Sequence, residues 1–338
     1  MGLDEKGFRG FIREGRGVPK GLKESTVRSH ILVIKEFERF LEERGSSTEF
    51  SGAIASDVNG FVTELARKCA LETDALMGLL RYSRFCRNDD VTAALLVLLD
   101  SDLLRRLARS FEEEFGEDVH ARVLGGYEAP PLGSPANTMP SLTGEFMRRL
   151  EGGVGDDATR RFLIDRCPHM GPPESYSEER ELFVASKDVD DYLSRRRRAF
   201  VAELEGHMRE GTLFYNQRID ETVVDYVRKN PEVGTGQRRG NVIYHTKIPY
   251  MAIEYLRDKD PRAKRYHYCH CPLAREAILS GEEVSRNLCY CSGGYTKRPF
   301  EIAFNRSLKV EVVKSALWGD SVCQFAVEIP EEMLPIRR

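Results

Sequence analysis

Hydrophobic residues recur every three or four positions through the first third of the chain. Between positions 27 and 41 they lie on one face of a helix that Ser25 or Thr26 can cap and that ends at Gly45. Similar spacing predicts further helices over 57–70, 71–86, 91–99 and 103–115. Residues 1–24 are rich in glycine and charge, and we expect a loose lead-in there. Residues 1–124 are therefore predicted to form a helical bundle domain.

A different pattern follows a segment rich in proline and glycine. We place a linker at residues 125–144 and a second domain at 145–338. Helical spacing in that domain predicts helices over 188–208, 219–229, 248–256 and 273–279. A short strand is predicted at 241–244, and alternating patterns at 309–313 and 324–329 predict an antiparallel pair that turns around Gly319-Asp320. The predicted fold class is α+β, with an N-terminal all-helical bundle and a C-terminal α+β domain whose sheet is mostly antiparallel.

Composition and charge narrow the class of protein. The 338 residues are 41% hydrophobic and 31% charged, and the formal net charge is -3. A protein with this small negative net charge has no overall electrostatic attraction to nucleic acid or to an anionic membrane. No apolar run approaches the roughly 20 residues of a membrane span, and residues 1–6 lack the apolar core of a signal peptide. We expect a cytoplasmic protein with neither a membrane nor a nucleic-acid partner, in which clustered cysteines are ligands or reactive thiols.

Five of the eight cysteines lie between positions 269 and 323, and four of them form two Cys-x-Cys pairs. We expect residues 266–271 and 289–291 to be extended, so that the two cysteines of each pair point to one face. Two such segments would bring four thiols to one point, which suits a tetrahedral zinc ion or, alternatively, an iron–sulfur cluster. The predicted metal ligands are Cys269, Cys271, Cys289 and Cys291. Additional candidate ligands are Cys323, His267, His270 and Cys167.

Two other interpretations of the cysteines stay open. One is a reactive thiol, activated by His270 or by the helix after Pro272, with His267 and His270 as acid–base candidates. The other is that these cysteines are small buried side chains without chemistry. Whether the protein is an enzyme is therefore left open.

The cysteine-rich segment resembles a known group of proteins. The relevant stretches are Cys269-His270-Cys271-Pro272-Leu273-Ala274-Arg275-Glu276, Cys289-Tyr290-Cys291-Ser292-Gly293-Gly294-Tyr295 and Gly319-Asp320-x-x-Cys323-x-Phe325. Over residues 160–330 the chain resembles a cysteine-rich branch of the group that contains L-2-amino-thiazoline-4-carboxylic acid hydrolase-like proteins and vinyl-4-reductase-type sensor domains. The resemblance implies a zinc site near the final hairpin, to which Cys323 carries over, whereas Ser315 stands where another cysteine is expected.

A second resemblance concerns the helical half. Thr26–Arg44 and Leu79–Phe85 resemble the core-binding domain of tyrosine recombinases. The catalytic set of that family, His-x-x-Arg followed by a C-terminal tyrosine nucleophile, is missing, so DNA cleavage is not predicted. The alternative is a packing or dimerisation module, which leaves a homodimer open.

A small-molecule ligand is also predicted beside the cysteines. The guanidinium of Arg275 suits a carboxylate, and aromatic side chains can wall a pocket. The predicted ligand-binding residues are Arg275, Tyr268, Tyr295 and Trp318. The predicted function is a small-molecule-binding protein with a cysteine-ligated metal site. The alternatives are a thiol-dependent hydrolase resembling the thiazoline-carboxylate group, and a non-enzymatic sensor or scaffold that uses the helical domain to bind a partner.

Overall fold

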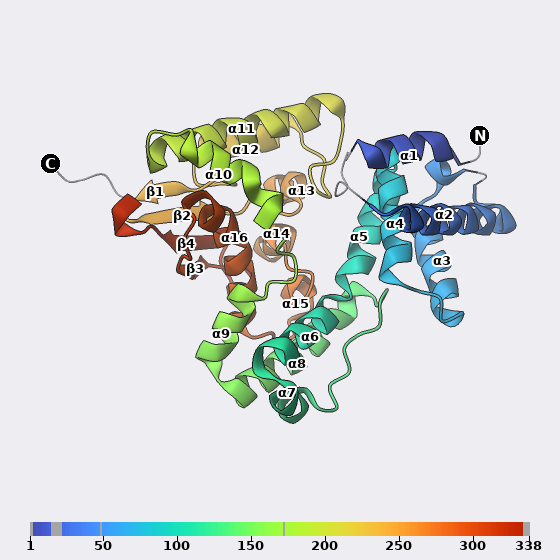
Figure 1. Cartoon of the computed structure of the whole chain (residues 1–338), viewed down its shortest axis with the longest axis horizontal. Helices are drawn as coiled ribbons and strands as arrows, with labels where there is room; N and C mark the ends of the chain where they lie inside the picture. The colour runs from blue at the N-terminus through green and yellow to red at the C-terminus, as the bar shows by residue number, and fades with distance from the viewer. Residues whose placement is uncertain (1–2, 15–21, 48, 172, 334–338) are drawn as a thin grey trace. The chain divides into compact units, whose positions relative to one another are not determined.

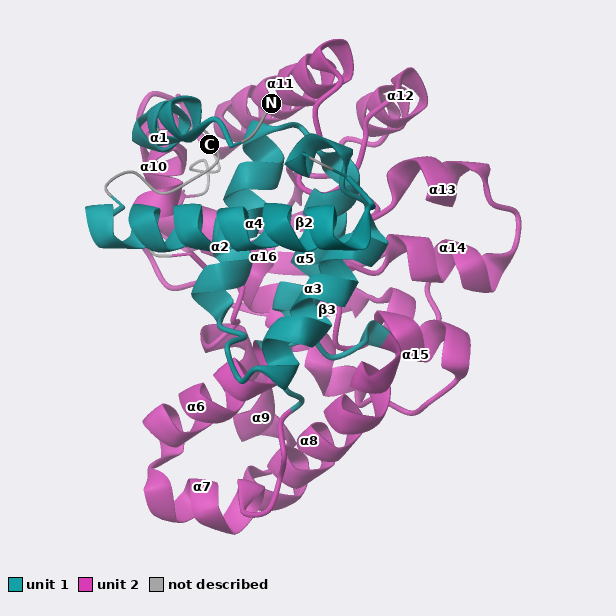
Figure 2. Ribbon diagram, turned by 90° about the vertical axis from the view of Figure 1, so that its right-hand side faces the viewer, with its two compact units in different colours: residues 1–102, 130–136 teal, residues 103–129, 137–338 magenta. Residues whose placement is uncertain are grey.

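The computed structural model describes residues 3–14, 22–47, 49–171 and 173–333. The chain divides into two compact units, coloured separately in Figure 2: unit 1 is residues 1–102 with 130–136, and unit 2 is residues 103–129 with 137–338. This division differs from the predicted boundary, because residues 103–124 belong to unit 2. The predicted linker at 125–144 also contains the start of a helix at Met139.

Unit 1 is all-helical, as predicted. Its helices are α1 (Glu5–Arg13), α2 (Glu24–Arg44), α3 (Ala55–Arg67), α4 (Thr73–Phe85) and α5 (Asp89–Asp100). Their apolar faces enclose one core, in which the ring of Phe37 lies 5.1 Å from those of both Phe50 and Phe61. The expected loose lead-in is wrong over residues 5–13, where Phe8 and Ile12 are buried on one face of α1. The rest of the predicted lead-in at 15–21 lies outside the described residues.

Unit 2 combines helices with one small sheet, so the predicted α+β class is confirmed (Figure 1). The helices of its first part are α6 (Leu103–Phe115), α7 (Glu117–Leu124), α8 (Met139–Val154), α9 (Asp156–Asp165), α10 (Ser177–Val184), α11 (Val189–Glu210) and α12 (Glu221–Lys229). The later helices are α13 (Ala252–Arg257), α14 (Pro261–Tyr268), α15 (Arg275–Ser280) and α16 (Cys289–Phe304).

The sheet of unit 2 is antiparallel, with the strand order β1-β2-β4-β3. Its strands are β1 (Gln237–Arg239), β2 (Val242–Thr246), β3 (Val310–Lys314) and β4 (Gln324–Glu328). The predicted pairing of the last two strands is confirmed, with Val312 opposite Phe325. Between them Gly319 adopts a φ of 109°, and the Asp320 carboxylate accepts a hydrogen bond from the backbone N–H of Ser315 at 2.9 Å. The Gly-Asp pair therefore forms the turn for which it was proposed.

Helix α16 is the element that the sequence predicted least well. Its first residues, 289–291, were expected to be extended, but they lie within the helix, as do Gly293 and Gly294. The glycines serve close packing on two sides. Gly293 faces Val310 and Phe325 of the sheet, whereas a Cβ atom on Gly294 would lie 1.9 Å from the carbonyl oxygen of Ile164 in α9. Helix α16 is therefore held between the sheet and α9.

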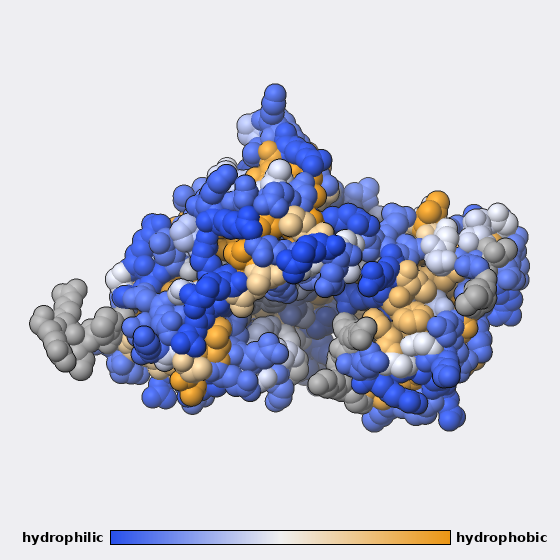
Figure 3. Space-filling model, turned by 90° about the horizontal axis from the view of Figure 1, so that it is seen from above, coloured by the Kyte–Doolittle hydropathy of each residue, from blue (hydrophilic) through white to orange (hydrophobic). Residues whose placement is uncertain are grey.

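On the face shown in Figure 3, hydrophilic residues predominate and hydrophobic ones gather in a few separate areas. Among the described residues, no helix is both long enough and apolar enough to cross a lipid bilayer.

Candidate functional site

The predicted cysteine-ligated metal site is wrong. Among residues 3–14, 22–47, 49–171 and 173–333, no three His, Cys, Asp or Glu side chains are placed so that they could hold one metal ion. The cause is secondary structure. Both Cys-x-Cys pairs were expected in strands, but His267 lies in α14, Cys269 caps that helix, and Cys289 and Cys291 are in the first turn of α16. In a helix, residues i and i+2 point roughly 200° apart, so the thiols of Cys289 and Cys291 diverge.

One face of α16 sends Cys289 into the core beside the sheet, where Cys269 and Cys323 also lie. The Cys289 sulfur is 3.0 Å from the Ser315 hydroxyl, and the Cys323 sulfur accepts a hydrogen bond from the backbone N–H of Ala316 at 3.4 Å. Burial raises the pKa of the Cys269, Cys289 and Cys323 thiols. These three cysteines are therefore protonated core residues at neutral pH. They fit the interpretation in which the cysteines are small buried side chains.

The other face of α16 places Cys291 against Cys167, which follows the C-terminal end of α9. Both side chains are buried in one hydrophobic cluster, with exposed fractions of 5% for Cys167 and 9% for Cys291. The Cys167 and Cys291 side chains influence each other's ionisation, and the backbone N–H groups of His169 and Met170 also favour the charged form of Cys167. Cys167 and Cys291 are named the thiol pair below.

The packing of the two helices positions the thiol pair. The contact between Gly294 and the carbonyl oxygen of Ile164 fixes how closely α16 and α9 approach. Each cysteine is three residues from that contact, Cys167 after Ile164 and Cys291 before Gly294. Because a larger side chain at position 294 would force the helices apart, the glycine sets the distance between the sulfurs.

Lys247 supplies positive charge to the thiol pair. It follows β2, and its Nζ atom donates a hydrogen bond to the Ser292 hydroxyl at 3.1 Å, one residue beyond Cys291. The ammonium lies 5.2 Å from the ring centroid of Tyr295 and 5.8 Å from that of Phe325. No ion pair joins it to a carboxylate in the described part of the chain. Its charge therefore acts on the thiols without competition from a neighbouring anion.

The two thiols differ in their acidity. The neighbouring Cys291 side chain, the two backbone N–H groups and the charge of Lys247 together lower the pKa of Cys167 to about 7. The neighbouring Cys167 side chain, together with burial, raises the pKa of Cys291 well above its ordinary value. At neutral pH Cys167 is therefore the member of the pair that is partly ionised, and it is the nucleophile, because the thiolate is the reactive form of cysteine.

The two histidines predicted as acid–base groups have other roles. The Nε2 atom of His270 donates to the carbonyl oxygen of Ile248 at 2.6 Å, and burial, followed by the charge of Lys247, lowers the pKa of His270 to about 3. His267 lies 3.2 Å from the carboxylate of Asp258. Neither imidazole hydrogen-bonds a cysteine in the described chain. The structure therefore does not form the acid–base arrangement expected for a thiol-dependent hydrolase.

The structure shows local contacts for each of the predicted ligand-binding residues. Tyr268 is fully buried, and its hydroxyl donates to the carbonyl oxygen of Lys247. Tyr295 lies beside the Lys247 ammonium, whereas the indole N–H of Trp318 donates to the Arg286 carbonyl oxygen at 3.1 Å. The Arg275 guanidinium is 4.4 Å from the ring centroid of Tyr250 and 5.3 Å from that of Tyr266. Each of these side chains therefore has its own local partners.

Sequence reasoning identified Cys167 and Cys291 separately but did not join them, and it missed the role of Lys247. In the sequence Lys247 stands three residues beyond the strand predicted at 241–244, and nothing there relates it to the cysteines. Nothing in the spacing relates a residue at 167 to one at 291, because the contact depends on how α9 packs on α16.

Comparison with known proteins adds one match. A profile described as "Family of unknown function (DUF6144)" matches residues 255–334. The matched stretch contains five cysteines, including Cys291, but neither Cys167 nor Lys247. No curated protein and no solved structure matches the chain. The resemblances to the hydrolase-like and sensor group and to tyrosine recombinases stay predictions.

Proposed function

We propose that unit 2 carries out thiol redox chemistry at Cys167 and Cys291, with a small peroxide as the oxidant. The observation that carries this proposal is the burial of the two cysteines in one cluster beside the close contact of α16 with α9, at a point where two backbone N–H groups and the Lys247 ammonium also stabilise negative charge on Cys167. A thiolate next to a second thiol is the arrangement that allows reversible oxidation.

The chemistry proceeds in two balanced steps. The Cys167 thiolate attacks the O–H oxygen of the peroxide and the O–O bond breaks. The proton of the attacked oxygen passes to the other oxygen, which leaves as an alcohol or water, and the sulfenate at Cys167 takes a proton from solvent to become the sulfenic acid. The Cys291 thiol then attacks the Cys167 sulfur, a disulfide forms, and water departs. Two electrons pass from the thiol pair to the peroxide. A low-molecular-weight thiol, which a reducing cytoplasm supplies, returns the disulfide to the dithiol.

Burial favours a small oxidant over a protein disulfide. The 5% exposure of Cys167 admits a molecule of peroxide size more readily than a bulky partner. The core thiols Cys269, Cys289 and Cys323 take no part, because they are held in the protonated form. The small-molecule ligand, the cytoplasmic location and the homodimer expected from the sequence are compatible with this proposal and stay predictions.

Peptide mapping after mild oxidation tests the proposal. Reduced full-length C69S protein, which lacks the exposed Cys69, is treated with equimolar hydrogen peroxide, and its free thiols are blocked before analysis by mass spectrometry. We expect a disulfide between Cys167 and Cys291 to form first. In C291S, Cys167 should stop at the sulfenic acid and react with dimedone, whereas C86S in unit 1 should behave as the parent protein. Oxidation that begins at another pair, or that spares Cys167, would overturn the proposal.

A further inference from the structure

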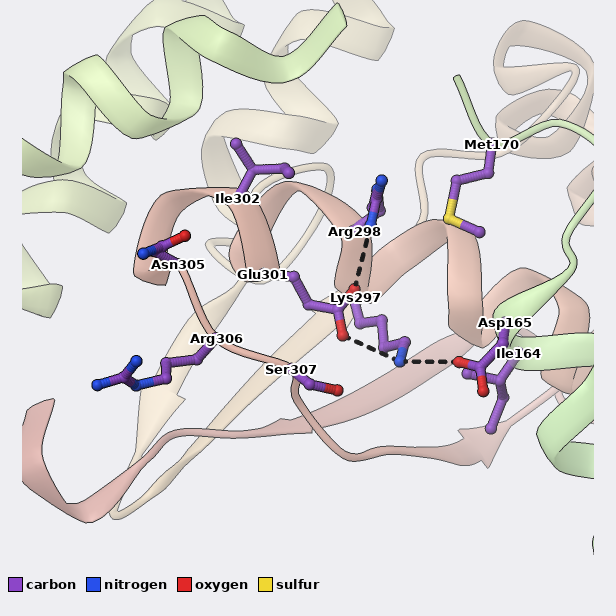
Figure 4. A pocket seen from close by; sticks show the side chains of 10 residues that line it. All are labelled: Ile164, Asp165, Met170, Lys297, Arg298, Glu301, Ile302, Asn305, Arg306 and Ser307. Carbon is purple, nitrogen blue, oxygen red and sulfur yellow. Dashed lines mark hydrogen bonds and ion pairs between the residues drawn. The ribbon is translucent and has the colours of Figure 1, made fainter. Parts of the chain in front are cut away.

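A second feature of unit 2 is a cavity of about 430 Å³ between the C-terminal end of α9 and the C-terminal half of α16. Figure 4 shows its lining, which combines the apolar side chains of Ile164, Met170 and Ile302 with several charged groups. Its size is within the range of sites that hold small metabolites. Every residue that lines it belongs to unit 2.

Lys297 lies at the cavity between the carboxylates of Asp165 and Glu301, and the three charged groups pair with one another. The Lys297 ammonium lies 3.0 Å from Glu301 and 3.3 Å from Asp165, and it donates to the Leu308 carbonyl oxygen at 3.4 Å. Glu301 also accepts a hydrogen bond from the backbone N–H of Leu308 at 3.0 Å. Because Lys297 is only 7% exposed and has these partners, it is a structural cation and has little remaining capacity for a ligand.

Arg298, the next residue on α16, is in a different position. Its Nε atom is buried without a hydrogen-bond partner. Within the described chain its only opposite charge is the Glu301 carboxylate at 3.9 Å, which is too long for a hydrogen bond. A buried donor without a partner is destabilising, so an anion bound by the guanidinium gains from satisfying such donors as well as from the charge interaction. Figure 4 shows Arg298 at the cavity beside Glu301.

A second guanidinium and two neutral polar groups lie at the same cavity. Arg306 also lines it and is 60% exposed, with Glu332 at 3.5 Å as its partner. Asn305 and Ser307 on either side of Arg306 supply an amide and a hydroxyl. The lining therefore offers cationic donors for an oxyanion and neutral groups for the polar remainder of a ligand.

We propose that this cavity binds a small metabolite through a carboxylate or phosphate group, which the Arg298 guanidinium holds and Arg306 supports. The planar fork of arginine suits both groups, because each presents two oxygen atoms to two N–H donors. The side chains of Met170 and Ile302 then contact the apolar part of the ligand. This site does not depend on the thiol pair, so either proposal can fail without the other.

Isothermal titration with two probes tests the inference. Inorganic phosphate and citrate are titrated separately into the full-length protein in a low-chloride buffer at pH 7. We expect saturable one-site binding of at least one probe. R298Q should weaken it by about tenfold or more, the loss expected when a charge-assisted hydrogen-bonded pair is removed. R298K, which keeps the charge but not the fork, should recover part of the affinity.

A matched surface variant controls for general charge effects. Arg195 on α11 forms an ordinary helix-surface pair with Asp191 at 3.0 Å, so R195Q should bind both probes as the parent protein does. Binding of phosphate alone, of citrate alone or of both supports the site and distinguishes the oxyanion that it prefers. Absence of saturable binding, or binding that R298Q and R195Q weaken equally, overturns the inference.

Discussion

The carbonyl oxygen of Ile164 lies against Gly294 so closely that a Cβ atom at that position would be 1.9 Å away. The contact joins α9 to α16 three residues from each member of the thiol pair. It explains why two adjacent glycines, which elsewhere signal a turn, are found inside a helix that begins with Cys289. Close packing at this point is the condition for the Cys167–Cys291 contact.

The first prediction concerns this packing. G294A should lower the free energy of unfolding by about 1–3 kcal/mol, because backbone atoms of α9 cannot give way as a flexible side chain would. It should also slow formation of the Cys167–Cys291 disulfide. Urea unfolding followed by circular dichroism measures the first effect, and the peroxide assay measures the second.

Gly206 in α11 is the matched control for this substitution. A Cβ atom there meets nothing within 4 Å. Since alanine is the better helix former by about 1 kcal/mol, G206A should stabilise the protein. Equal effects of G294A and G206A would contradict the role assigned to the contact with Ile164.

The second prediction concerns the reactivity of Cys167. Because its pKa is lowered to about 7, its rate of alkylation by iodoacetamide should rise with pH to a midpoint near that value. K247Q should move the midpoint upward, since the positive charge that favours the thiolate is lost. K314Q, which removes an exposed lysine from β3, should leave it unchanged. Mass spectrometry of the Cys167 peptide gives the rates, and a midpoint near the ordinary cysteine value of about 8.5 would contradict the prediction.

The third prediction concerns stability at acidic pH. His270 stays neutral in the folded protein because its pKa is lowered to about 3, whereas in the unfolded chain it binds a proton below about 6.5. Folding is therefore penalised as the pH falls from about 6.5 towards 3, and this penalty is absent at neutral pH. H270Q, whose amide can still donate to the Ile248 carbonyl oxygen, should lose stability less steeply than the parent between pH 6.5 and 4. Urea titrations at several pH values measure the difference, and parallel curves would show that His270 does not contribute.

The fourth prediction concerns the buried ion pair of α16. K297M leaves the Glu301 carboxylate, which is 12% exposed, without its partner at 3.0 Å and with only Arg298 at 3.9 Å, and should cost about 3 kcal/mol. K297M/E301Q should recover part of that loss, because the buried carboxylate that lost its lysine is then neutral. R195M breaks the more exposed pair with Asp191 and should cost less than about 1 kcal/mol. Thermal and urea unfolding provide the comparison, and similar losses for K297M and R195M would contradict the buried character of the first pair.

Long repeating patterns were sufficient to predict much of the fold. The stretch from 24 to 44 shows helical spacing over several turns, and the structure confirms it as α2. The alternation at 309–313 and 324–329 likewise predicted β3 and β4, because one face of each strand is buried and the Gly-Asp turn joins them. In such segments local periodicity and burial agree, so the sequence alone is informative.

The two Cys-x-Cys pairs were too short for that kind of reasoning. Three residues do not distinguish a strand from the first turn of a helix, and the choice decides whether two thiols share a face or diverge. Pro261 favours the start of α14, the helix that Cys269 caps. The glycines of α16 allow that helix to pack against α9 and the sheet.

By itself, the sequence determined the α+β class, the helical first unit, the final hairpin and the concentration of cysteines in the second half. Only the tertiary structure decided which cysteines meet. Cys289, two residues before Cys291, turns to Ser315, while Cys291 meets Cys167 from a distant part of the chain. The reason is physical: side-chain direction follows from local backbone conformation, but the partner that a side chain finds depends on helix packing, which no short sequence pattern encodes.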